Sequence, residues 1–148
     1  MGQMTMREVL SAIDQKHKES GIIFNSPASE LQIRNFERKI GFELPFDFRE
    51  FYLICNGFEC AEDIFRIISL GDALQSEQDY GKNWFHFAEY MTFCDMWSLR
   101  SKGDRMYEIF NKGEIEVILT SSLQEFLERF LQGNVFDRGG LYDWHEEL

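Results

Sequence analysis

The stretch LPFDFREFYLICNGFE, Leu44 to Glu59, carries a proline near its start, an Asn-Gly pair near its end and large apolar residues between them. Apolar residues at i, i+3, i+4 and i+7 line one face of an α-helix, and a proline fits the first helical turn. The spacing therefore predicts a helix that begins near Pro45 and buries one stripe of side chains. The residues of that stripe are Phe48, Phe51, Tyr52 and Cys55.

The pair Asn56-Gly57 is expected to end this helix, because glycine adopts positive φ without steric cost. Burial of one aromatic side chain stabilises the folded domain by about 2 kcal/mol or more, so burial of the whole stripe contributes several times that amount. We therefore interpret Leu44–Glu59, including Pro45, Asn56 and Gly57, as structural.

Two further helices are predicted before this stretch. Thr5 and Glu8 form a capping-box pattern ahead of a helical repeat that runs to His17. Ser29 and Gln32 repeat the pattern, and the helix that follows is expected to end at Gly41. The apolar faces of these helices contain Met6, Val9, Leu10, Ile13 and His17 in the first and Ile33, Phe36 and Ile40 in the second.

Between residues 63 and 120 the pattern changes from helical to alternating, with turn residues at short intervals. The run IFNKGEIEVI predicts a hairpin around Asn111-Lys112-Gly113, and the sheet is expected to be antiparallel. Residues 72–80 lack clear periodicity and are interpreted as a short helix or a loop. Strands are predicted near 64–70, 84–90, 93–100, 105–110 and 115–119.

A third capping-box pattern, Ser122 with Glu125, precedes an apolar helical repeat that ends near Gly133. The order of elements predicts an α+β fold with N-terminal helices, a central antiparallel sheet of about five strands and a C-terminal helix packed on the sheet. The length of 148 residues and the lack of a linker favour a single domain over residues 1–148.

The net charge of the chain limits the classes of molecule that it is expected to bind. Fifteen basic and 26 acidic residues give a net charge of −11, which disfavours nucleic acid and anionic membranes and favours a basic partner. No apolar run is long enough to cross a membrane, so a soluble, cytoplasmic protein is expected. The odd set Cys55, Cys60 and Cys94 predicts reduced, mostly buried thiols.

The block SELQIRNFERKIGFELPFDFREFYLICNGFE resembles the first block of the SUKH superfamily, which contains the yeast Smi/Knr cell-wall regulators and many bacterial immunity proteins. The pattern is an Ile and a Glu on a helix, then Gly, Leu-Pro, an aromatic-rich helix and Asn-Gly. The later WFHFAEY and SSLQEFLERFLQG resemble the family's central strands and closing helix. The matching residues of the first block are Ile33, Glu37, Gly41, Leu44, Pro45, Phe48, Phe51, Asn56 and Gly57.

The chain departs from the family pattern in FAEYMTFCDMWSL, where Met91 and Thr92 replace a Gly-rich turn that family members often carry. The resemblance implies a non-enzymatic module that binds another protein. In bacteria this partner is commonly a toxin, often a nuclease, that the producing cell neutralises in its cytosol. A regulatory adaptor of the Smi/Knr type is the alternative, and the oligomeric state stays open.

Motifs for catalysis, cofactors and metals are not recognisable in the sequence. His17, His86 and His145 are scattered, and no His-x-x-x-His or Cys-x-x-Cys pair is present, so no metal site is expected. Ser122 is interpreted as a helix cap, because no nucleophile-elbow motif surrounds it. No glycine-rich phosphate loop occurs. We therefore expect no enzyme activity and no cofactor.

Aromatic and acidic residues in the central strands are the candidates for partner binding. Alternation along NWFHFAEYM places Trp84, His86 and Tyr90 on one side of a strand and Phe85, Phe87 and Glu89 on the other. Phe85 and Phe87 are expected to face the helices, which leaves the first set exposed. Aromatic anchors and steering carboxylates suit a basic protein, although the rings could instead complete a second core layer. The candidate partner-binding residues are Trp84, His86, Glu89, Tyr90, Asp95 and Trp97.

Overall fold

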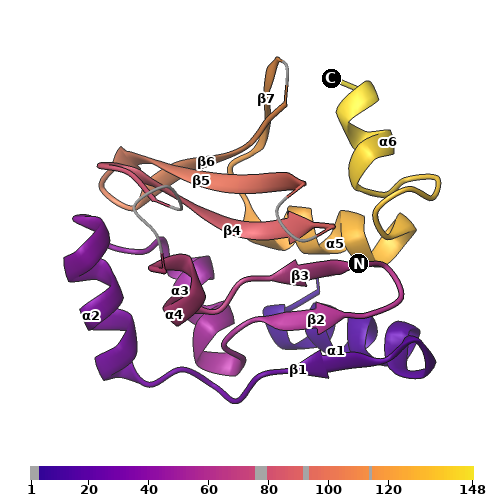
Figure 1. Ribbon diagram of the computed structural model, residues 1–148, viewed down its shortest axis with the longest axis horizontal. Coiled ribbons are helices and arrows are strands. Elements are labelled where there is room, and N and C mark those ends of the chain that lie inside the picture. The colour runs from indigo at the N-terminus through magenta and orange to yellow at the C-terminus, as the bar shows by residue number, and fades with distance from the viewer. Residues whose placement is uncertain (1–3, 76–79, 92–93, 114) are drawn as a thin grey trace.

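The computed structural model describes residues 4–75, 80–91, 94–113 and 115–148. Seven strands form one antiparallel sheet in which neighbours in sequence are neighbours in space (Figure 1). This arrangement is an α+β meander, which confirms the predicted fold class. The strands are β1 (Ile22–Phe24), β2 (Phe58–Cys60), β3 (Phe65–Ile67), β4 (Trp84–Tyr90), β5 (Asp95–Gly103), β6 (Met106–Lys112) and β7 (Glu116–Thr120).

The three predicted helix starts are confirmed, and the full capping box forms at two of them. In both of the first two helices the capping box is complete, with the cap hydroxyl and the carboxylate or amide exchanging bonds with the backbone. Before the closing helix, Ser122 accepts from the Glu125 N–H, but the Glu125 carboxylate binds the Thr120 hydroxyl instead of returning the bond. The helices are α1 (Met6–His17), α2 (Glu30–Ile40), α3 (Phe46–Ile54), α4 (Leu70–Ala73), α5 (Leu123–Gly133) and α6 (Leu141–Glu146), with a short 3-10 helix η1 (Lys18–Ser20).

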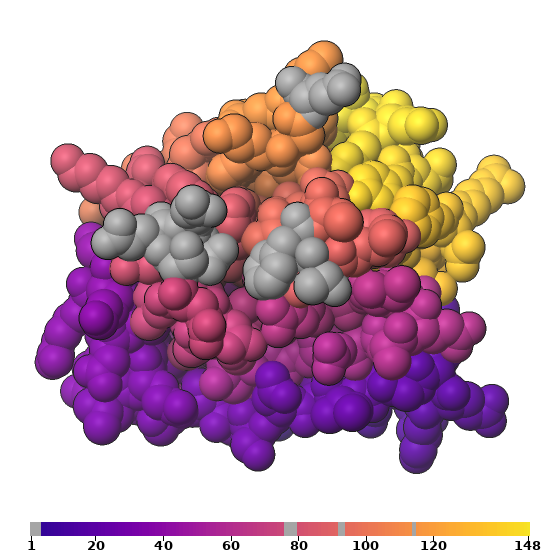
Figure 2. All heavy atoms as spheres, viewed as in Figure 1, coloured from indigo at the N-terminus to yellow at the C-terminus, as the bar shows by residue number. Residues whose placement is uncertain are grey.

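One face of the sheet is covered by helices. In Figure 1, α1 and α5 lie behind the strands, and α1, α3 and α5 contact one another. Helix α2 packs against α3 and α4 at one end of the sheet, and α6 packs on α5 at the other. We call the side of the strands opposite α1 and α5 the open face. In Figure 2 the colour of the surface changes from indigo at the bottom to orange at the top, so the chain rises through the molecule in sequence order, and the yellow C-terminal part lies beside the orange part.

The stripe of α3 lies in the core. Phe48, Phe51 and Tyr52 are fully buried, and Phe48 contacts Phe87 edge-to-face at 5.1 Å between ring centroids. The Tyr52 hydroxyl donates to the Ile68 carbonyl at 2.8 Å, which satisfies the one polar atom that the ring takes into the core. Leu44–Glu59 therefore joins the helical layer to the sheet.

The turn after α3 is built from Asn56 and Gly57. The helix ends at Ile54, and the Asn56 side chain accepts a bond from the Leu70 N–H at 2.9 Å. Gly57 has φ +89°, and a Cβ there would lie 2.4 Å from the Ile67 carbonyl oxygen. Both the backbone conformation and the close approach of β3 therefore require glycine.

The sheet has more strands than the five expected. β1 and β2 have three residues each, too few for an alternating pattern to be recognised, and the predicted strand 64–70 is divided between β3 and α4. The expected hairpin turn is displaced, because Asn111 and Lys112 pair with Val117 and Glu116 within the ladder. Helix α6, which covers the last part of the chain, was not expected. The central residues of 72–80, and Thr92 with residue 93 of the predicted turn and strand, lie outside the described residues.

Candidate protein-binding face

A β-bulge in β4 decides which residues reach the open face. His86 pairs with Ser98 and Ala88 pairs with Trp97, so Phe87 is an extra residue in the ladder. Phe87 and Ala88 are both fully buried, and the alternation reverses after them. The bulge therefore turns Glu89 toward the open face and the next residue, Tyr90, toward the helices, the reverse of the expected sides.

Trp84 and His86 lie on the open face as expected, and both are half-buried. Their rings contact at 4.9 Å between centroids, and the His86 Nδ1 shares a hydrogen bond with the buried Ser98 hydroxyl. The Trp84 indole packs on Gly81, where a Cβ would lie 2.0 Å from the indole nitrogen. A side chain at position 81 would displace the indole, so Gly81 positions Trp84.

Beside these rings, Arg100 of β5 is held by two carboxylates. It bonds Glu108 of β6, and its Nη2 lies 2.9 Å from the Glu116 Oε2 of β7. These hydrogen bonds raise the pKa of Arg100 and lower the pKa of both glutamates. The guanidinium carbon also lies 4.3 Å from the Phe110 ring centroid, a cation–π distance. Both orientation and charge of this arginine are thereby fixed.

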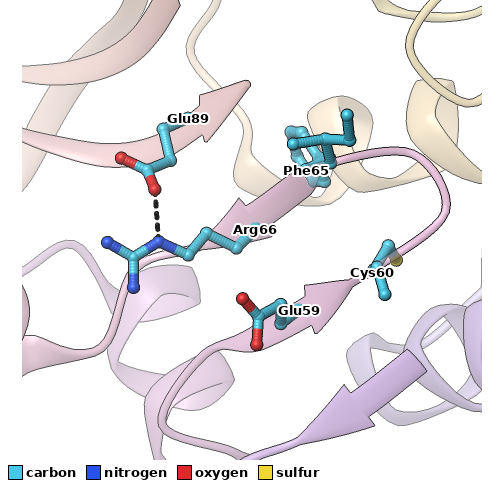
Figure 3. A pocket seen from close by; sticks show the side chains of 7 residues that line it. Glu59, Cys60, Phe65, Arg66 and Glu89 are labelled. Carbon is cyan, nitrogen blue, oxygen red and sulfur yellow. Dashed lines mark hydrogen bonds and ion pairs between the residues drawn. The ribbon is translucent and has the colours of Figure 1, made fainter. Parts of the chain in front are cut away.

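A second arginine cluster lies on β3 and β4. Figure 3 shows Arg66 directed toward Glu89, and its Nη1 lies 3.1 Å from the Asp72 carboxylate. Glu89 is 4% exposed, so it is a buried partner of Arg66 and not the exposed steering charge that the sequence suggested. Glu59 lies opposite Arg66 on β2 and is exposed. A small cavity of about 100 Å³ lies among β2, β3 and the end of β4.

The other three predicted binding residues lie on the helix side under α6. Tyr90 contacts Phe136 at 5.1 Å and Tyr142 at 6.3 Å between ring centroids. Asp95 binds the Tyr142 hydroxyl and accepts from the Asn111 side chain at 2.9 Å. Trp97 is fully buried. Tyr90, Asp95 and Trp97 are therefore docking residues for the C-terminal helix, the second core layer that the sequence left as an alternative.

The open face contains a hollow of about 410 Å³ over β4 to β7. An apolar wall, two fixed charges and an exposed lysine meet there, so the hollow can accept an amphipathic side chain of another protein. Sequence reasoning identified only Trp84 and His86 among the residues that line this hollow. The other lining residues lie on β5, β6 and β7, and their approach to Trp84 depends on how these strands pair. The lining residues are Trp84, His86, Arg100, Phe110, Lys112 and Glu116.

Titratable groups also meet away from the open face. His17, Cys60 and Asp63 each present a ligand-type atom, and these atoms lie within 4.8 Å of one another. Spacing along the chain could not reveal this cluster, because His17 ends α1 whereas Cys60 ends β2 and Asp63 lies in the β2–β3 turn. Cys55 and Cys60 are buried free thiols, and Cys94 is exposed.

Within the described residues, no helix combines the length and apolar character needed to cross a membrane. Comparison with curated proteins finds no match. Comparison with protein families finds that residues 27–129 match the model of the SMI1 / KNR4 family (SUKH-1). The matched span runs from the loop before α2 into α5 and so contains the α3 stripe, strands β2 to β7 and the hollow on the open face. The chain therefore belongs to the SMI1 / KNR4 family (SUKH-1).

Proposed function

We propose that this protein is a non-enzymatic immunity protein that binds a basic toxin domain in the cytosol through the open face of its sheet. The observation that carries the proposal is the hollow beside Trp84 and Phe110, which is bordered by charges fixed in ion pairs. A half-buried aromatic ring in a preformed hollow is the kind of anchor that dominates protein interfaces.

The negative charge of the protein supports a basic partner. The net charge is −11, and each of the two open-face arginines is paired with two carboxylates, so neither presents uncompensated positive charge. A nuclease presents Lys and Arg to hold phosphates, and an acidic protein can cover that surface. The toxin class we propose is therefore a nucleic-acid-cleaving domain with a basic active-site surface.

Co-expression tests this proposal. The partner to use is the toxin domain encoded beside the gene for this protein, expressed with and without it, and growth is the readout. We expect the wild-type protein to protect the cells and Trp84→Ala to protect them less. Phe46→Ala is the matched control, because Phe46 is an exposed aromatic on α3, in the helical layer. Equal killing with and without the wild-type protein would remove the immunity proposal.

A regulatory adaptor of the Smi/Knr type is the second candidate, because the matching family is named after SMI1 and KNR4. An adaptor would bind a host protein and would not change the toxicity of a neighbouring gene product. Affinity capture separates the two: recovery of the toxin domain favours immunity. Recovery of one host protein, lost in Trp84→Ala and kept in Phe46→Ala, favours the adaptor.

A further inference from the structure

We infer that His17, Cys60 and Asp63 form a zinc site that ties the end of α1 to the β2–β3 turn. The inference is independent of the proposed function. It rests on three side chains of the types that bind zinc, supplied by two separate parts of the fold.

The distances suit a tetrahedral ion. The His17 Nδ1 lies 3.2 Å from the Asp63 Oδ2, and all three ligand atoms lie within 4.8 Å of one another. Zinc with bonds of about 2.0–2.3 Å places its ligand atoms about 3.3–3.6 Å apart. A small adjustment of the side chains would therefore bring all three ligand atoms onto one ion, with water in the fourth position.

His17 is an unusual residue to bury without such a role. It is 2% exposed and stacks on Phe130 at 5.1 Å between ring centroids. Its Nδ1 is beside Asp63, but its Nε2 is buried with no hydrogen-bond partner among the described residues. A metal ion bound at Nδ1 would add a strong bond at the nitrogen that faces Asp63, and the ring proton would then stay on Nε2.

The electrostatic surroundings favour a cation. His17 is the last residue of the 12-residue helix α1, where the helix dipole is negative. Burial raises the pKa of Asp63, His17 and to a smaller extent Lys16 oppose this rise, and the nearby carboxylates of Glu62 and Asp137 add to it. Burial, with the carboxylates of Asp63 and Glu59, raises the pKa of Cys60 to about 12, so a metal ion must displace the thiol proton and its affinity should rise with pH.

The chemistry of the three donor atoms indicates which kind of metal ion they would bind. The thiolate is a soft donor and the imidazole a borderline one, and with only one hard carboxylate beside them the set suits zinc better than magnesium or calcium. Asp63 has a side chain that is 24% exposed, so an ion can enter from the solvent side of the turn.

Titration of the full chain with Zn²⁺ and Co²⁺ tests the site. All proteins should carry Cys94→Ser, because Cys94 is an exposed thiol that could bind metal by itself. We expect binding of one ion per chain, a thiolate-to-cobalt charge-transfer band and a higher melting temperature with zinc. Absence of saturable binding in this protein would overturn the inference.

Three variants locate the binding. Cys60→Ser should abolish the charge-transfer band, and Asp63→Asn, at a partly exposed turn position, should weaken zinc at least about 10-fold without unfolding the protein. Cys55→Ser is the matched control, because Cys55 is also a buried free thiol but lies outside the cluster. Binding that Cys60→Ser and Asp63→Asn leave unchanged would assign the metal to the acidic surface and contradict the site.

Discussion

The Trp97 indole Nε1 donates a hydrogen bond to the His145 Nε2 over 3.2 Å. This bond joins the first part of β5 to α6, and it requires a lone pair on Nε2, so the imidazole is neutral with its proton on Nδ1. Burial lowers the pKa of His145, although Asp95 partly opposes this effect. The C-terminal helix is therefore docked by a group that loses its acceptor when protonated.

Stability should fall in mild acid for this reason. The folded pKa of His145 lies below the ordinary 6.5, so the unfolded chain takes up the proton first and the free energy of unfolding decreases as pH falls from 6.5 toward the folded pKa. Urea unfolding at several pH values should show a steeper loss for wild type than for His145→Gln, which keeps an acceptor but does not titrate. Equal pH dependence of the two proteins would contradict the assignment.

The α3 stripe predicts a large effect at Phe51. Phe51 is fully buried, so Phe51→Ala should lower the free energy of unfolding by about 3–5 kcal/mol. Phe46 is 71% exposed on the same helix and packs under Arg105, so Phe46→Ala should cost less than about 1 kcal/mol. Chemical denaturation of both variants gives the comparison, and similar losses would show that the stripe is not the core of this helix.

Gly57 and Gly103 have nearly the same φ, so substituting each of them distinguishes the cost of backbone strain from the cost of a steric clash. Gly57 has φ +89° and Gly103 has φ +90°, but only at Gly57 would a Cβ meet another strand. Gly103→Ala should cost about 1 kcal/mol from conformation alone, whereas Gly57→Ala should cost more than about 2 kcal/mol. Equal costs in thermal or urea unfolding would mean that β3 moves away from the turn without penalty.

Much of this architecture could be predicted from the sequence, because α1, α2 and α5 have strong apolar periodicity and side-chain caps, and α3 follows a proline with a stripe of aromatic residues. The short strands β1 and β2 could not, since three residues cannot establish a period and their pairing depends on partners far along the chain. Helix α6 has no side-chain cap hydrogen bond and only six residues, so local signals for it are weak.

The candidate site was harder to predict for a specific physical reason. One extra residue in β4 reversed the alternation after Phe87, which moved Glu89 to the open face and Tyr90 to the helix side. Bulges leave no reliable mark in a single sequence. Arg100 and Glu116 were missed because their approach depends on the register of two hairpins.

Salt should slow association with a basic toxin domain, if the open face is the binding surface. Screening shortens the reach of charge from about 30 Å at 0.01 M salt to a few ångströms above 0.5 M, so the association rate should fall while dissociation changes less. Glu59→Lys, an exposed position on the open face, should lower the association rate more than Asp14→Lys on the exposed side of α1. Equal effects would place the interface elsewhere. Glu89 is unsuitable for this test because it is buried with Arg66.

The most direct measurement of the central claim is the equilibrium affinity between the purified protein and the toxin domain encoded beside it, determined by calorimetric titration. We predict a one-to-one complex that Trp84→Ala weakens by more than about 10-fold, as loss of an aromatic anchor does, while Phe46→Ala leaves it unchanged. Far-ultraviolet circular dichroism should show both variants folded. No detectable heat with the wild-type protein, or a complex that is equally tight with Trp84→Ala, would contradict the account.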